Sequence, residues 1–288
     1  MNILTQSLFS GLISGAVYAL LATGLVLAYR TSGVPNLAHG ETFAVAGLAT
    51  AAMERSGTSL LVAVPVALAL AVAVSVAVEV LLLRPRRSWS LTGLVLVTLA
   101  FGFFSRGVLI LLFGSDPLSF SSLVGLPPLR LLGGALPAQG TALILASLTA
   151  CAGVALLLTR TPLGRQLRAS AINPDAAQLL GVNVAGARIL AFGLAGALGG
   201  LAAVLLVPLT SVDFQSGLGM TLRGFIAAAL AGMSEKRAIW AGFTLGIVEA
   251  VVSGYVGALF QDPIVFAGLI VVALLQARSV RFGGALRA

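Results

Sequence analysis

The chain has 288 residues, of which 59% are hydrophobic and 9% are charged, and its formal net charge is +8. A soluble globular protein carries about 25% charged residues, so this composition excludes a soluble enzyme, a nucleic-acid-binding domain and a disordered chain. The class that remains is an all-α polytopic helical membrane protein. We expect residues 1–288 to form a single transmembrane domain.

Apolar runs predict the membrane-spanning elements. A helix needs about 20 residues to cross a bilayer, so the second, seventh and ninth runs are short and are expected to be broken, tilted or re-entrant. In chain order the runs are Leu8–Tyr29, Asn36–Met53, Leu60–Leu83, Leu91–Phe113, Gly140–Leu158, Ile189–Pro208, Leu218–Met233, Ile239–Leu259 and Ile264–Gln276.

Basic residues predict the orientation, because Lys and Arg concentrate in cytoplasmic loops. Basic residues follow the first, third, fifth, seventh and ninth runs, whereas Arg55, Arg106, Arg130 and Arg223 lie elsewhere. This pattern predicts nine crossings with the N-terminus outside and the C-terminus cytoplasmic. An arrangement of eight crossings with one re-entrant run stays open.

Glycine spacing suggests an internal repeat. Gly15 and Gly40 are separated by 25 positions, and so are Gly199 and Gly224. Each pair joins a glycine-rich span to a short run, and the first and sixth spans run in opposite directions in the predicted topology. An inverted repeat places the pathway at the interface of its halves. A chance match in a glycine-rich chain is the alternative.

The loop at residues 159–188 contains a predicted short helix, Pro174–Leu180. Asn173 is a favoured N-cap, Pro174 suits the first helical position, and Gly181 ends the helix. A helix of two turns is unstable alone in water, so its apolar face must pack on something. That face contains Ala176, Ala177, Leu179 and Leu180. It packs either on the cytoplasmic ends of this chain or in a groove on a partner.

Polar residues in the second run are expected at a gate or pathway. His39 and Glu41 flank Gly40, where a broken helix would expose polar groups. The alternative is that neighbouring backbone groups satisfy both side chains. We expect Asn36 to cap this run.

Charges in the later runs allow two interpretations. Glu79 lies five residues before Arg84, with which it can pair, and Arg106 can extend toward the outer surface. Arg223, beside Gly224, either extends toward the outer surface as Arg106 does or meets the carboxylate of a solute that moves inward. Glu249 lies deep in its run, either as a hydrogen-bonding group between helices or as a pathway group.

No catalytic or metal-binding set is present in the sequence. The chain has one histidine and one lysine, Lys236, and no Walker A motif or His-Glu-x-x-His pair. We therefore expect no catalytic residue, metal or cofactor on this chain, and no ATP hydrolysis by it.

Several sequence blocks resemble one family. Gly33, Asn36, Ala38, His39, Gly40 and Glu41 form one block; Gly164, Arg165, Arg168 and Ala169 form a second; and Leu179, Leu180, Gly181, Val182 and Asn183 form a third. Together with matches in other spans, they resemble the H-type permease subunits of bacterial ABC importers for branched-chain amino acids. The resemblance implies a multi-pass inner (plasma) membrane subunit that moves such amino acids or similar small zwitterions.

The resemblance also implies partners and roles. The partners are two cytoplasmic ATPase subunits that bind ATP and Mg, a second permease (an M-type subunit or a second copy) and a periplasmic solute-binding protein, with no nucleic acid. Alternating access would be coupled to the ATPases through Arg165, Arg168, Asn173, Pro174, Ala176, Ala177, Leu179, Leu180 and Gly181. The expected pathway or gate residues are Asn36, His39, Gly40, Glu41, Arg223, Gly224 and Glu249.

One segment departs from the family pattern. Members usually have a glycine-rich turn after the seventh run, whereas this chain has the charged stretch Ser234, Glu235, Lys236 and Arg237. Two alternatives stay open: an ABC permease for urea or short amides, and an ion-coupled secondary transporter using His39, Glu41 and Glu249.

Overall fold

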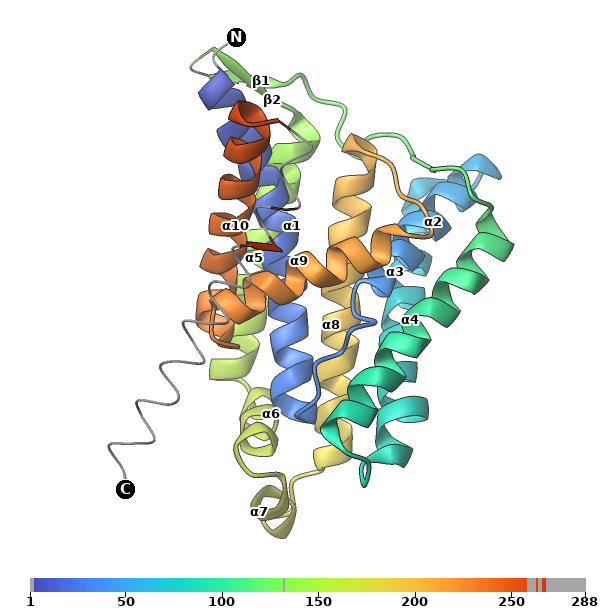
Figure 1. Ribbon diagram of the computed structural model, residues 1–288, viewed down its shortest axis with the longest axis vertical. Helices are drawn as coiled ribbons and strands as arrows, with labels where there is room; N and C mark the ends of the chain where they lie inside the picture. The colour runs from blue at the N-terminus through green and yellow to red at the C-terminus, as the bar shows by residue number, and fades with distance from the viewer. Residues whose placement is uncertain (1–2, 132, 258–262, 264–265, 268–288) are drawn as a thin grey trace.

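The fold is a helical bundle with one short hairpin (Figure 1). The computed structural model describes residues 3–131, 133–257, 263 and 266–267. Its helices are α1 (Ile3–Ser32), α2 (Glu41–Arg55), α3 (Leu60–Ala77), α4 (Leu91–Phe113), α5 (Ala138–Arg160), α6 (Pro162–Ile172), α7 (Pro174–Leu179), α8 (Val184–Leu206), α9 (Ser216–Leu230) and α10 (Glu235–Tyr255). Strands β1 (Leu129–Leu131) and β2 (Gly134–Leu136) pair antiparallel. The predicted all-α membrane class is confirmed.

Local sequence signals explain where several helices begin. Before α4, Oγ of Ser90 accepts a hydrogen bond from the N–H of Gly93 at 3.2 Å. Before α8, Oδ1 of Asn183 accepts one from the N–H of Gly186 at 2.9 Å. Such caps satisfy amides that have no partner within the helix. Beyond its last α-helical turn, α3 continues as a π-helical segment, Val78–Leu83, and a 3-10 turn, Arg84–Arg86.

Six helices of the described chain have the length and composition to cross a membrane. They are Ile3–Ser32, Leu60–Arg86, Leu91–Phe113, Ala138–Arg160, Val184–Leu209 and Glu235–Tyr255. The second and seventh predicted runs form the shorter helices α2 and α9, each preceded by a non-helical segment, residues 33–40 and 210–215. The expectation of interrupted elements at these two places is therefore confirmed. The ninth run, Ile264–Gln276, lies outside the described residues except for Phe266 and Ala267.

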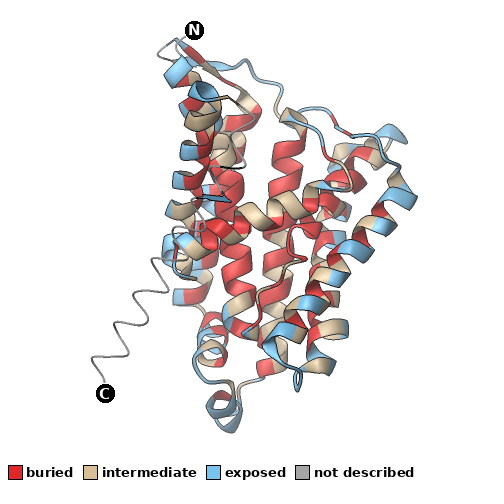
Figure 2. Ribbon diagram, viewed as in Figure 1, coloured by how far each residue is buried: buried red, intermediate tan, exposed pale blue. Residues whose placement is uncertain are grey.

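Helices α1 and α8 form the centre of the bundle. Figure 2 shows both buried along most of their length, whereas α4 and α10 each expose an outward face. α10 packs on α1, and α3 packs on α8. α9 contacts α1, α2 contacts α8, and α2 and α9 contact each other. In Figure 1, α9 is tilted relative to the upright helices and crosses the middle of the bundle.

These pairings have the symmetry of an inverted repeat, α1–α2–α3 and α8–α9–α10. α1 begins at the same end of the bundle at which α8 finishes (Figure 1), so the two helices run in opposite directions. Gly11 and Gly15 of α1 pack on α10, and Gly196 and Gly200 of α8 pack on α3. Gly199, which the spacing suggested, instead packs on Thr42 of α2. Glycines recur here because helix backbones approach closely.

The two ends of the bundle differ. The hairpin end carries β1 and β2, where the side chain of Gln6 exchanges hydrogen bonds with the backbone of Ala135. The opposite end carries α6 and α7 and is called the α7 end below (Figure 1). Arg30, Arg188 and Lys236 lie at or near the α7 end of their helices, so basic residues gather there as the orientation rule requires.

Candidate functional site

The chain re-enters the bundle between α1 and α2. α1 ends where Gly33 adopts a φ of +77°. Oδ1 of Asn36 then accepts a hydrogen bond from the N–H of Ala38 at 3.0 Å, and Asn36 is buried. The prediction that Asn36 caps the second helix is wrong, because α2 begins at Glu41 with Gly40 in the N-cap position. Asn36 instead stabilises the turn that leads into the helix.

The two re-entrant segments touch at Gly40. Its N–H donates a hydrogen bond to Oγ1 of Thr221 on α9 at 2.8 Å. A Cβ atom at Gly40 would lie 2.6 Å from the backbone nitrogen of Thr221, which is closer than real atoms approach. Gly224 lies inside the continuous helix α9, so the interruption expected in the seventh run does not occur at this glycine. Gly224 packs on Leu21 of α1, and the break precedes α9 at residues 210–215.

A buried ion pair joins α2 to α4 beside this crossing. Nε of Arg106 donates to Oε1 of Glu41 at 3.3 Å, and Glu41 is fully buried. Arg106 therefore points into the bundle, and the prediction that it extends to the outer surface is wrong. A Cβ at Gly217 would lie 2.7 Å from the carboxylate, so Glu41 also lies against the first turn of α9. The positive end of that helix dipole favours a negative charge.

His39 faces a different part of the bundle from Glu41. Its ring lies against Gly24 of α1, where a Cβ would be 3.0 Å from Nε2, and near Gly199 of α8. The backbone of Leu21 lies near the ring, but neither ring nitrogen makes a hydrogen bond of good geometry with a described residue. Glu41 instead contacts α4 and α9, so the two side chains do not form a pair.

A second ion pair joins α9 to α10. Nε of Arg223 donates to Oε1 of Glu249 at 2.9 Å. The Glu249 side chain is 1% exposed, whereas 21% of the Arg223 side chain stays accessible. Tyr18 of α1 lies close to both groups. Two sequence-predicted pathway residues are therefore brought together, and the guanidinium is the accessible member of the pair.

Glu79 has a different partner from the one predicted. Its Oε1 accepts a hydrogen bond from Nη2 of Arg87 at 2.7 Å, whereas the expected direct partner was Arg84. The π-helical segment Val78–Leu83 and the following 3-10 turn change the helical register, which places Arg87 rather than Arg84 over the carboxylate.

The loop at the α7 end has the predicted local structure. Oδ1 of Asn173 accepts a hydrogen bond from the N–H of Ala176 at 3.0 Å, and Gly181 adopts a φ of +80°. Ala177 is buried, whereas Leu179 and Leu180 are 89% and 83% exposed. The apolar face therefore packs on this chain only through Ala177, which disfavours the interpretation that this chain covers the whole face.

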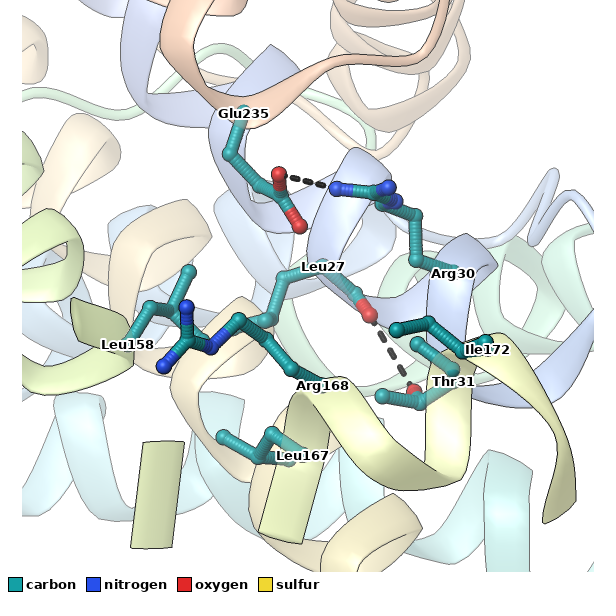
Figure 3. A pocket seen from close by; sticks show the side chains of 9 residues that line it. Leu27, Arg30, Thr31, Leu158, Leu167, Arg168, Ile172 and Glu235 are labelled. Carbon is teal, nitrogen blue, oxygen red and sulfur yellow. Dashed lines mark hydrogen bonds and ion pairs between the residues drawn. The ribbon is translucent and has the colours of Figure 1, made fainter. Parts of the chain in front are cut away.

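A small pocket of about 90 Å³ connects this loop to the end of α1 (Figure 3). α6 contributes Leu167, Arg168 and Ile172, and Arg30 of α1 forms an ion pair with Glu235 of α10 at its edge. The charged turn that departs from the family pattern thus joins α10 to α1. The pocket is lined by Leu27, Arg30, Thr31, Leu158, Leu167, Arg168, Ala171, Ile172 and Glu235.

The end of α1 is also fastened to α8. Nε of Arg188 donates a hydrogen bond to the carbonyl oxygen of Thr31 at 2.9 Å. An arginine at this position satisfies a carbonyl that has no partner within its helix. Movement of α6 would therefore reach both central helices at the point where the chain turns into residues 33–40.

Sequence reasoning missed three members of the central site: Arg106, Gly217 and Thr221. Arg106 had a usable signal, because an apolar chain that buries Glu41 must supply an opposite charge nearby. Gly217 and Thr221 had none, because glycine and threonine are common in spans and these two matter only through contacts with Gly40 and Glu41, which are distant in sequence.

Comparisons with known proteins agree with one another. Residues 7–276 match the family described as branched-chain amino acid transport system, permease component. The chain is 26% identical to the high-affinity branched-chain amino acid transport system permease protein BraD of Pseudomonas aeruginosa, covering 94% of this chain and 93% of that protein. It is 27% identical to LivH of Escherichia coli strain K12, a permease protein described in the same words, with the same coverage.

An archaeal relative and a solved structure extend the likeness. The probable branched-chain amino acid transport permease protein LivH of Methanocaldococcus jannaschii is 27% identical, covering 92% of this chain and 86% of that protein. The structure of PsaBC from Streptococcus pneumoniae in complex with Fab matches with a TM-score of 0.50 and 16% identity. That match covers 94% of this chain and 91% of the other, and it shows a shared fold.

Proposed function

Because the chain belongs to the family of permease components of branched-chain amino acid transport systems, we propose that it carries a branched-chain amino acid or a similar small zwitterion across the inner membrane. The observation that carries this proposal is the meeting of two re-entrant segments inside the bundle, at Gly40 and Thr221. Interrupted elements at a repeat interface are the usual place for a transport site. Arg223 and Glu249 supply one charge of each sign for such a solute.

The chain works as one membrane-spanning subunit of an ABC importer. Two cytoplasmic ATPase subunits bind ATP and Mg and supply the energy. A second permease, either an M-type subunit or another copy, completes the pathway, and a periplasmic binding protein delivers the solute. The α7 end, with its basic residues, faces the cytoplasm, and the C-terminus lies on the same side.

Leu179 and Leu180 are the proposed contact with the ATPases. Both are exposed on a helix that makes little contact with its own chain, and a hydrophobic groove on a partner would bury them. Arg165 and Arg168 on α6, the helix that precedes α7, are proposed to belong to the same coupling element. α7 joins α6, and α6 packs against the end of α1, so motion of the ATPases reaches residues 33–40 through rigid helices.

The re-entrant crossing is the proposed gate. Gly40 holds it closed through direct contact with α9, and the Glu41–Arg106 pair fixes the start of α2. Opening requires α9 to separate from residues 36–41. A state in which ATP-driven motion replaces these contacts with others would give alternating access, since only a difference in contacts between two states can couple them.

The function is tested by reconstituting the complex of permeases, ATPases and binding protein in proteoliposomes. We expect uptake of leucine to require ATP inside the vesicle and to be unaffected when the proton gradient is dissipated. Urea and acetamide should not compete. Uptake driven by a proton gradient without ATP would contradict the proposal, and competition by urea would contradict the proposed substrate class.

Coupling is tested in the same vesicles with Leu179→Arg/Leu180→Arg. We expect this variant to fold normally, since both side chains are exposed, but to lose copurification of the ATPases. The matched control is Leu163→Arg, which changes an exposed leucine on α6 and leaves α7 intact. Retention of the ATPases by the double variant would contradict the assigned contact.

A further inference from the structure

A polar groove of about 310 Å³ lies between α1 and α10 near the hairpin end. Its volume is at the lower end of the range for small-molecule sites, about 300–1,000 Å³. Both helices are membrane-spanning candidates, so the groove is formed by two spans and not by a loop. The polar side chains that line it are Gln6, Ser7, Ser10, Ser14 and Ser253.

The lining contrasts with the other outward surfaces of the spans. Leu61 of α3, Leu111 of α4 and Leu145 of α5 are largely exposed, as expected for surfaces that contact lipid. A hydroxyl transferred into hydrocarbon without a hydrogen-bond partner is costly. A row of serines on α1 is therefore poorly suited to face lipid and well suited to face water.

The serine hydroxyls lack the partners that other hydroxyls in the spans have. Thr50, Ser147 and Thr244 each donate a hydrogen bond to a backbone carbonyl. Ser7 and Ser14, by contrast, make no hydrogen bond to any other described residue. Ser7 is only 8% exposed and is one of the residues that line the groove, where its hydroxyl lies against Gly254 of α10. Hydroxyls that line a groove and have no protein partner are available to bind water or solute.

The groove leads toward the Arg223–Glu249 ion pair. Ser10, Ser14 and Tyr18 follow at helical spacing on one side of α1, and four residues advance the helix by about 6 Å. Tyr18 lies close to both members of the pair. On α10, Glu249 directly precedes Ala250, which lines the groove. The serine row and the ion pair are therefore consecutive parts of one polar surface.

α9 closes this surface at its inner end. Leu21, one turn beyond Tyr18 on α1, packs on Gly224, which is next to Arg223 on α9. A solute moving along the serines would thus meet the guanidinium, the accessible member of the pair, before it reached the re-entrant crossing.

We propose that the groove is the entrance vestibule of the pathway and that it takes a zwitterionic amino acid. The serine hydroxyls replace water around the ammonium and carboxylate groups of the solute, while Arg223 and Glu249 orient it at the inner end. This inference rests on the proposed function for the identity of the solute. The water access of the groove is tested without any transport measurement.

Cysteine labelling tests water access directly. The experiment uses the assembled complex in proteoliposomes with Cys151→Ser as background, and introduces Ser10→Cys, Ser14→Cys or Ser253→Cys. A membrane-impermeant, charged methanethiosulfonate reacts only with an ionised thiol in water. Ser115→Cys in the loop after α4 is the positive control, and Leu145→Cys on the surface of α5 is the lipid-facing control.

We expect the groove cysteines to react as readily as Ser115→Cys, and Leu145→Cys to stay unmodified. Saturating leucine with its binding protein should slow labelling of Ser14→Cys about tenfold, as expected for a site occupied about 90% of the time. Groove cysteines as unreactive as Leu145→Cys would overturn the vestibule. Labelling without protection by leucine would overturn the assigned solute class.

A transport measurement separates this inference from the proposed function. Ser10→Trp fills the groove, and Leu145→Trp adds the same volume on the surface of α5. We expect Ser10→Trp to lower leucine uptake about tenfold, which corresponds to the loss of about 1.4 kcal/mol of favourable interaction. If Ser10→Trp took up leucine at the wild-type rate, the vestibule assignment would be overturned, whereas the proposed function as a leucine transporter would stand.

Discussion

The backbone N–H of Gly40 donates a hydrogen bond to the hydroxyl of Thr221 at 2.8 Å, joining two re-entrant segments that are 181 positions apart. The contact exists because Gly40 has no side chain and because α9 begins just before Thr221. It lies beside the buried carboxylate of Glu41. The central site is therefore a crossing of two interrupted elements, held by one hydrogen bond and one neighbouring ion pair.

Gly40→Ala should abolish transport. The added methyl would lie 2.6 Å from the backbone nitrogen of Thr221, so residues 36–41 and α9 must separate. The matched control is Gly153→Ala on α5, where no atom lies within 4 Å of the new methyl. We expect ATP-driven leucine uptake to be lost in Gly40→Ala and retained in Gly153→Ala. Equal uptake by both variants would show that the crossing does not control the pathway.

Removing one partner of the Glu41–Arg106 pair should lower the stability of the folded protein strongly. Glu41→Gln or Arg106→Met leaves a poorly solvated charge, and breaking a buried pair typically costs about 3–5 kcal/mol. The double variant removes both charges and should recover part of that loss. The measurement is the thermal unfolding midpoint of the purified protein in detergent, analysed as a double-mutant cycle. Strictly additive losses would mean that the two groups do not interact.

α1 and α10 should separate when their glycine contact is filled. A Cβ at Gly246 would lie 2.6 Å from the carbonyl oxygen of Gly11, and Gly15 also lies against this surface. Small residues spaced four apart on both helices let the backbones approach. Gly246→Leu should therefore fail to reach a monodisperse folded state in size-exclusion chromatography.

The control for this contact is Gly107→Leu on α4, where nothing lies within 4 Å of an added Cβ. We expect that variant to elute like the wild type. A well-folded Gly246→Leu protein would show that the close packing of α1 against α10 is dispensable.

Asn173→Ala should weaken coupling without unfolding the bundle. Its side chain caps α7, and loss of such a cap costs about 1 kcal/mol, which is large for a two-turn helix. The matched control is Asn183→Ala, which removes the equivalent cap from the long helix α8. We expect leucine uptake per ATP hydrolysed to fall in Asn173→Ala and to stay near wild type in Asn183→Ala. A larger loss in the control would contradict a coupling role for α7.

Local features of this protein were predictable because their causes are local. Apolar runs predict the spans, and Asn173 followed by Pro174 predicts the start of α7, because desolvation and capping depend on neighbouring residues. The interruptions before α2 and α9 were also predictable in outline, since their runs are short. The glycine spacing indicated two glycine-rich spans that face short helices, but it did not give the register of the repeat, because Gly40 precedes α2 whereas Gly224 lies inside α9.

Tertiary structure alone decided how the charges are used and which surfaces stay open. Arg106 turns inward because Glu41 on the adjacent helix α2 lies within reach of it, and Arg87 replaces Arg84 because a π-helical segment changes the register. Most spans carry apolar residues on their buried and exposed faces alike, so their sequences do not distinguish a buried face from one that contacts lipid. Only the packing of the helices against one another distinguishes the two kinds of face. The same holds for the buried charges, because the energy of a buried charge depends on partners that distant segments supply.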